Sequence, residues 1–505
     1  MNKYILKAFA LLMPAMALLS CSKNFLNVVP LGKQVAQTVD DYNLLLNSEN
    51  FYFYNASGGW QELAIMGDDI AAEEPLLPSV YPQTLWAFQW RDSIWRQTDL
   101  ISPDLSEELL NLYTCNKVIA EVAGASGGTD TLKARLRAEA LAIRGWLNMQ
   151  FVNFYAKPYA ASTAASDPGF PIITTADINQ SKFQRSPVQS VYDAIIKDLT
   201  DAIPNLPVAA SIKTRMSRPA AEALLGRAYL YMGRYNDALM QFNAAFADMA
   251  GSGAYKLYDY NVEFAPGGAF VPAYPFLPAN TPGNNYNDLT EAVWSVEFYN
   301  GPITSLGGGI STSTGIGGAG SFGNNGIVIT PGAAALYSPG DLRLKLYAAT
   351  DPDGTPNAGG RLRKSGVTYS RCGMQVPDLY LMKAECEARL NNAAAAKADL
   401  ETLRQHRMPA AQATVPADTL ASQVALIQYV LDERIREFAA EGYRWWDMRR
   451  LSVDPLFAGR QYIHTLYHDD AQGTSTQFML NQPNRLTLKL PPALLLANPD
   501  MTDNP

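Results

Sequence analysis

Two pairs of adjacent acids are the residues whose chemistry stands out first. Asp68 and Asp69, followed by Glu73 and Glu74, lie in residues 50–100, which also hold half of the chain's eight tryptophans. Two carboxylates that flank a cleft could hydrolyse a glycosidic bond. Adjacent side chains, however, seldom converge on one bond. We therefore assign no catalytic residue and expect a protein that is not an enzyme.

The histidines offer little for a metal site. Only His406, His464 and His468 are present, and the last two are four residues apart without the glutamate of an HExxH zinc motif. We therefore predict neither a metal site nor a cofactor.

The charge and the aromatic content of the chain limit the kinds of partner that it is expected to bind. The 505 residues carry 40 Lys and Arg against 48 Asp and Glu, a formal charge of −8, which argues against a broad surface for nucleic acid. With 48% hydrophobic and 17% charged residues, the chain is expected to fold rather than to be disordered. Its 26 Tyr, 19 Phe and 8 Trp suit contact with sugars or peptides.

The first residues indicate export. Residues 1–20 contain two lysines and then the apolar run Ala8–Leu19, which is too short to span a bilayer. The run ends in Leu18-Leu19-Ser20-Cys21, which resembles a bacterial lipobox. This pattern predicts that residues 1–20 are a signal peptide and that Cys21 becomes the lipidated N-terminus. The alternative is an ordinary signal peptide cleaved at a small residue. Membrane contact is then expected through the lipid anchor only.

A helical repeat organises much of the chain. Ala220–Met249 places small and aromatic residues at the offsets of a tetratricopeptide repeat, and Asp378–Arg407 is a weaker copy. A third apolar pattern at helical spacing begins near Leu132 and follows a predicted helix over Ser106–Val122. The fold class expected is mainly α, a tetratricopeptide-like scaffold with long irregular loop insertions and a few short strands. Insertions of this length exclude a regular solenoid.

The insertions differ sharply from the repeats. Residues 264–287 contain five prolines and no charge, and residues 298–340 contain no Asp, Glu, Lys or Arg. Such densities of proline and glycine predict loops. Between them, Glu291–Tyr299 alternates and is rich in valine and aromatic residues, which predicts one short strand with Trp294 in the core.

The sharpest signature lies near the C-terminus. It reads Leu431-Asp-Glu-Arg-Ile-Arg-Glu-Phe-Ala-Ala-Glu-Gly-Tyr-Arg-Trp-Trp-Asp-Met-Arg-Arg450. This segment resembles the ERxREFxxEGxRxxDLRR helix of the SusD/RagB family of Bacteroidetes outer-membrane lipoproteins, with Met448 where leucine is usual. Further landmarks of the family follow one another in order: Leu112–Ile119, Ala138–Tyr155, Tyr337–Arg343, Asp378–Glu385, Leu488–Pro491 and Asn498–Pro499.

The charges of this signature are expected to be structural. Their spacing favours pairs within one helix, such as Asp432 with Arg436 and Glu441 with Arg444. The dense Glu and Arg are therefore kept out of the predicted site.

The resemblance implies a function and a partner. Proteins similar to SusD bind a nutrient, usually a glycan, at the cell surface and pass it to a SusC-like TonB-dependent transporter in the outer membrane. A peptide or another nutrient taken up by the same route is the alternative, and a surface glycoside hydrolase is a remoter one. The resemblance also implies a single domain over residues 21–505. Its helical pairs would lie at about 106–155, 187–249 and 378–450, and its ligand-binding insertions at about 50–100 and 255–375.

Ligand contacts are expected from the aromatic insertions. A shallow platform of aromatic rings stacks on the C–H faces of sugars, while polar side chains bind the hydroxyls. The predicted ligand-binding residues are Trp60, Asp69, Trp86, Trp90, Tyr274, Tyr286 and Phe322.

Overall fold

The computed structural model describes most of the chain after residue 35. The described residues are 36–54, 60–74, 82–95, 103–271, 280–284, 289–299, 327–350, 354–364, 369–468 and 473–505. Cys21, Tyr274, Tyr286 and Phe322 lie outside them, and so do the side chains of residues 60–62, 82–84, 103 and 104. Within the described residues, no helix combines the length and the hydropathy that a bilayer crossing requires.

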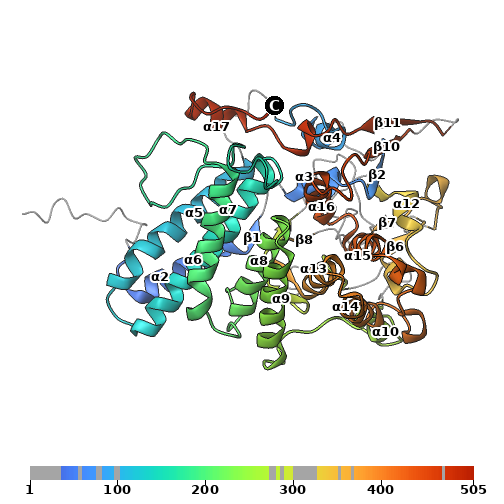
Figure 1. Ribbon diagram of the computed structural model, residues 1–505, viewed down its shortest axis with the longest axis horizontal. Helices are drawn as coiled ribbons and strands as arrows, with labels where there is room; N and C mark the ends of the chain where they lie inside the picture. The colour runs from blue at the N-terminus through green and yellow to red at the C-terminus, as the bar shows by residue number, and fades with distance from the viewer. Residues whose placement is uncertain are drawn as a thin grey trace, which may run out of the picture.

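Long helices form one side of the molecule (Figure 1). Helix α5 (Pro103–Glu121) packs against α6 (Asp130–Tyr155), which packs against α7 (Val188–Ala202), and the short α2 (Val39–Leu46) lies on α5 and α6. Thr38 caps α2 by accepting a hydrogen bond from the amide of Asp41. The predicted first helical pair is thus confirmed.

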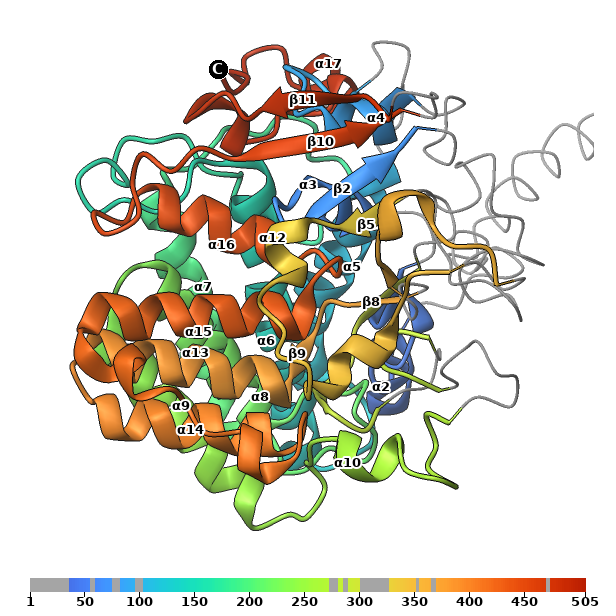
Figure 2. The ribbon, with the colours of Figure 1, turned by 90° about the vertical axis from the view of Figure 1, so that its right-hand side faces the viewer.

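The tetratricopeptide-like pairs continue this layer. Helix α8 (Arg218–Tyr231) packs against α9 (Tyr235–Ala250), and α13 (Val376–Arg389) packs against α14 (Ala393–Gln405). Gly226 lets α8 and α9 approach closely, since a Cβ at this position would lie 2.4 Å from the ring of Phe242. The mainly α, repeat-based fold class is therefore confirmed (Figure 2).

The C-terminal signature is two helices, where one was predicted. Helix α15 (Gln423–Phe438) ends before a turn, and α16 (Tyr443–Ser452) starts a new direction. Ala440 and Gly442 have φ of +62° and +92°, in the left-handed region that no helix interior contains. The prediction of a continuous helix over Leu431–Arg450 is wrong because Ala440 and Gly442 form a turn within it.

The ion pairs of α15 reach across the fold, apart from the pair of Glu433 with Arg436 along the helix. Glu433 accepts hydrogen bonds from Arg343, Arg404 and Arg436 at 2.6–3.0 Å. Burial raises the pKa of Glu433, but these three guanidinium groups hold it well below its ordinary range. The pairs predicted from spacing are not formed: Asp432 is bound by Gln428, Glu441 by Lys364 and Arg371, and Arg444 by Asp68.

A four-stranded sheet joins segments from distant parts of the chain. Its strand order is β11-β10-β2-β5, with β2 (Ile70–Glu73) between β10 (Ile463–Tyr467) and β5 (Ile327–Ile329), and with β11 (Ser475–Met479) beyond β10. Strand β10 runs parallel to β2 and antiparallel to β11. The sheet brings residues near position 70 beside residues near position 465.

The single strand predicted over Glu291–Tyr299 is divided. Strand β3 (Ala292–Trp294) pairs with β9 (Met374–Gln375), while β4 (Glu297–Tyr299) lies between β1 (Phe53–Tyr54) and β8 (Tyr369–Arg371). Trp294 is fully buried, as predicted. The remaining short elements are α3 (Trp60–Met66), α4 (Pro82–Phe88), α10 (Tyr260–Glu263), α12 (Pro331–Ala334), α17 (Pro492–Ala497), β6 (Tyr347–Ala348), β7 (Arg363–Lys364) and the 3₁₀ turns at Glu49–Phe51, Val122–Gly124, Ile203–Asn205, Leu342–Leu346, Ala358–Gly360, Ala410–Gln412, Ala417–Ala421 and Asn484–Leu486.

Candidate ligand-binding region

Helix α4 lies on the four-stranded sheet through an aromatic stack. The imidazole of His464 on β10 lies between Phe88 and Trp90, with ring centroids 4.5 and 3.7 Å away. Its two ring nitrogens lie 2.6 Å from the carbonyl oxygen of Phe88 and 2.7 Å from that of Gly67. Burial lowers the pKa of His464 to about 4, against the effect of these two hydrogen bonds. This stack holds in place the stretch from α4 to Trp90. That stretch belongs to residues 50–100, which carry most of the predicted ligand contacts.

Two of the predicted ligand-binding residues are used inside the protein. Trp90 is 4% exposed, and its indole nitrogen donates a hydrogen bond to the carbonyl of Met66. Asp69 is also 4% exposed and accepts a hydrogen bond from the amide of Ala440, at the strained turn between α15 and α16. Burial raises the pKa of Asp69 to about 6, against this hydrogen bond. Neither side chain presents a surface to a ligand, because both hold backbone in place.

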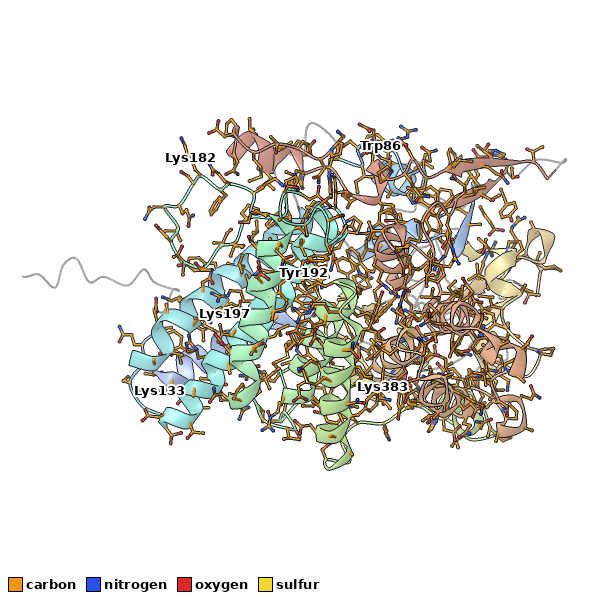
Figure 3. The ribbon with its side chains drawn as sticks, in the orientation of Figure 1. Trp86, Lys133, Lys182, Tyr192, Lys197 and Lys383 are labelled. Atoms are coloured by element: carbon orange, nitrogen blue, oxygen red, sulfur yellow. The ribbon has the colours of Figure 1, made fainter. Side chains whose placement is uncertain are left out.

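Trp86 has the exposure that a stacking residue needs. It is half-buried on α4, and the guanidinium carbon of the exposed Arg91 lies 5.6 Å from its ring centroid (Figure 3). Trp60 is the first residue of α3, and its side chain is outside the described part of the structure. Trp86 is therefore the one predicted aromatic contact that the described residues leave at a surface.

A cavity of about 760 Å³ follows α4 in the chain. Asp92, Ser93 and Trp95 line one side, and Lys489 and Asp503 belong to the C-terminal side. Asp92 pairs with Lys489 at 3.6 Å, and the Trp95 indole donates to the Lys489 carbonyl at 2.8 Å. The cavity combines apolar walls with charged groups that can bind hydroxyls.

A polar cluster closes the ends of β2 and β10. Glu73 accepts hydrogen bonds from Arg361 at 2.6 Å and from Arg363 at 2.8 Å, and Arg361 lies 4.4 Å from the ring centroid of Tyr467. Next to them, Glu74 is 2.5 Å from the imidazole of His468. Donors and acceptors of this kind suit a ligand with many hydroxyls.

The four acids considered as catalytic residues all have partners within the protein. Asp68 binds Arg444 at 2.5 Å, Asp69 binds a backbone amide, Glu73 binds two arginines and Glu74 binds a histidine. Among the described residues, no group of three or more His, Cys, Asp or Glu side chains is placed to hold a metal ion. The arrangement suits binding by hydrogen bonds and ring stacking.

Comparison with known proteins decides the family. The model of the SusD family matches residues 361–505, and a second family model, described as "starch-binding associating with outer membrane", matches residues 33–230. The chain belongs to the SusD/RagB family. No curated protein gives a significant sequence match to this SusD/RagB chain.

Solved structures of this family share the fold. A protein named "Putative sugar binding protein from Bacteroides vulgatus" is 22% identical over 94% of this chain and 99% of its own, with a TM-score of 0.66. A SusD superfamily protein from Bacteroides thetaiotaomicron is 18% identical over 93% and 100%, with a TM-score of 0.68. A laminarin-binding SusD-like protein is 16% identical over 93% and 99%, with a TM-score of 0.59.

Sequence reasoning missed most of the polar residues of this SusD/RagB protein's candidate region. Arg361 lies in the second expected insertion, at 255–375, but was not among the predicted contacts, and Tyr467 and Lys489 lie outside both insertions. In the sequence, these three residues are marked only by their positions beside short strands or in the C-terminal segment. Many other residues share such positions, so the sequence alone does not distinguish them. Pairing of β2 with β10 places Tyr467 beside Glu73, and a hydrogen bond to Glu73 holds Arg361 there.

Proposed function

We propose that this protein is a surface-exposed nutrient-binding lipoprotein that captures an oligo- or polysaccharide. The observation that carries the proposal is the family match at both ends of the chain, one part of it to a model described as starch-binding and associating with the outer membrane. The region around α4 supports it, since Trp86 offers a ring for stacking and Asp92 and Lys489 offer partners for hydroxyls. We further propose that the protein binds without cleaving.

We also propose a membrane anchor and a partner transporter for the protein. Acylation of Cys21 after removal of residues 1–20 would anchor it to the outer membrane, facing the cell exterior. It would deliver its ligand to a SusC-like TonB-dependent transporter. Affinity purification in mild detergent should recover such a barrel, and repeated recovery of the intact lipoprotein alone would contradict this partner.

A single folded domain over residues 21–505 is part of the same proposal. The largest cluster of buried apolar side chains draws on residues from Val39 to Met501, so both ends of the described chain share it. One cooperative unfolding transition, followed by circular dichroism and tryptophan fluorescence, is expected. Two separated transitions would contradict it.

Binding is tested with residues 22–505 and a panel of glycans and peptides, by calorimetry and by chromatography of the recovered ligand. We expect a glycan to bind and to be recovered intact. Trp86→Ala should weaken binding, whereas Tyr229→Ala should not. Tyr229 is the matched control because it is also half-buried, with the Arg234 guanidinium carbon 4.4 Å from its ring centroid. Binding of peptides alone would favour the alternative ligand, and cleaved product would favour a hydrolase.

A further inference from the structure

An apolar groove lies between α5, the loop that joins α6 to α7, and α17, whose other residues line the cavity beside Trp95. Its volume is about 470 Å³, and its walls include Leu109, Tyr113, Phe170, Ile173, Phe183 and Leu494. In Figure 1 this loop curves out beside α5 and below α17, and Figure 3 marks Lys182 within it. No part of the proposed function uses this groove.

The walls of the groove are held firmly. The Asn116 amide on α5 donates hydrogen bonds to the carbonyls of Ile173 at 3.0 Å and Thr175 at 3.3 Å, and the Phe183 amide donates to Asn498 at 2.9 Å. Phe170 is 2% exposed and stacks on a core phenylalanine. A preformed apolar groove of this kind usually marks a binding surface.

The chain itself contains a segment that suits the groove. Residues 25–31 read Phe-Leu-Asn-Val-Val-Pro-Leu, so six of the seven are apolar. They lie between Cys21, the proposed anchor, and Ala36, where the described chain begins. A tether that served only as a spacer in water would be expected to be polar, because apolar side chains are more stable when they are buried than in water.

The described chain begins within reach of the groove. The Tyr42 hydroxyl contacts both the Ala36 carbonyl, at 3.2 Å, and Glu121 at the C-terminal end of α5, at 2.7 Å. Glu121 and the groove residue Tyr113 are eight residues apart and share one stripe of α5, about 12 Å along the helix. The five residues from Leu31 to Ala36 can span about 17 Å when extended.

We propose that residues 25–31 dock in this groove as an extended strap along α5. If Cys21 is acylated, as proposed above, only the four residues 21–24 remain free, or about 14 Å of extended chain. The strap would then hold the face formed by α5 and α17 against the membrane. Docking itself does not require acylation, and the test separates the two.

Cross-linking tests the strap in the soluble Cys21→Ser chain. Val29→Cys is combined with Tyr113→Cys in the groove or with Met240→Cys, a 59% exposed control on α9, and treated with a short bismaleimide. The native Cys115, Cys372 and Cys386 are buried and should not react. We expect internal cross-linking at least tenfold faster with position 113. Equal rates, or cross-linked dimers in place of monomers, would overturn the proposal.

Hydrogen exchange gives an independent readout. Serine in place of Phe25, Leu26, Val28, Val29 and Leu31 should speed amide exchange in residues 170–183, and leave α13 and α14 unchanged. Unchanged exchange in residues 170–183 would overturn docking. Because the measurement uses unacylated protein, a failure of membrane anchoring or of glycan binding would leave its result intact.

Discussion

Removing the charge of Glu385 should destabilise the protein strongly at neutral pH. Glu385 is fully buried on α13 and accepts hydrogen bonds from Arg389 at 2.8 Å and from Arg450 at 2.6 and 2.7 Å. Glu385→Gln keeps the shape but leaves two buried guanidinium groups with fewer counter-charges. Breaking a buried pair by removing one partner costs about 3–5 kcal/mol.

The pKa of Glu385 gives a second estimate of the same contribution. Burial alone would raise this pKa, but the charges of Arg450 and Arg389 lower it from 4.5 to about 2. At about 1.4 kcal/mol per pKa unit, the ionised carboxylate contributes about 3 kcal/mol of stability. Because the folded-state pKa is the lower one, this stability is complete above pH 4.5 and is lost as the pH falls toward 2.

The assay is equilibrium urea unfolding of the wild type and of Glu385→Gln between pH 7 and pH 3. The difference in unfolding free energy should be about 3–5 kcal/mol at pH 7 and should shrink below pH 4.5. Asp201→Asn is the control, because Asp201 and its partner Lys197 are exposed on α7 and such surface pairs contribute about 0–1 kcal/mol. A Glu385→Gln difference below about 1 kcal/mol at pH 7, or one that stays constant down to pH 3, would contradict a stabilising role for the Glu385 charge.

Five further substitutions test other parts of the structure. Trp86→Ala should weaken glycan binding by about 0.5–1.5 kcal/mol with little change in stability. Trp90→Ala should instead cost about 3–5 kcal/mol of unfolding free energy. Calorimetry measures the binding and urea unfolding measures the stability, and the opposite pattern of losses would contradict both assignments. Cys21→Ala should abolish acyl labelling and release the protein from membranes, and a labelled, membrane-bound variant would contradict lipidation. Gly226→Ala should cost about 1–3 kcal/mol in urea unfolding, because its Cβ would lie 2.4 Å from a buried ring of α9; Gly251→Ala, which meets no atom within 4 Å, should be nearly neutral.

The helices were predictable because their signals are local. Small residues at tetratricopeptide offsets correctly predicted α8 against α9, where Gly226 meets Phe242. The apolar spacing around Ser106–Val122 predicted α5 to within a few residues. Such patterns depend on neighbours three or four positions away, which the sequence shows directly.

The partners of polar side chains could not be predicted in this way. Spacing favoured a pair between Glu441 and Arg444, but the left-handed Gly442 lies between them, so they do not share one helix. The long-range partners Lys364 and Asp68 bind them instead. Trp90 looked like a ligand platform because of its aromatic neighbours in sequence, yet its ring stacks on His464, 374 positions later. Both sets of contacts are defined only by the tertiary fold.

The position of β2 between β5 and β10 sets the order in which the chain can fold as it is synthesised. Residues near 70 are made early, but their sheet partners at 327–329 and 463–467 follow hundreds of residues later. Until then the apolar faces of α3, β2 and α4 stay uncovered, and such long-range strand pairing is slow. A chain that stops before β10 would leave this part unfinished, exposed to proteases and in need of a chaperone.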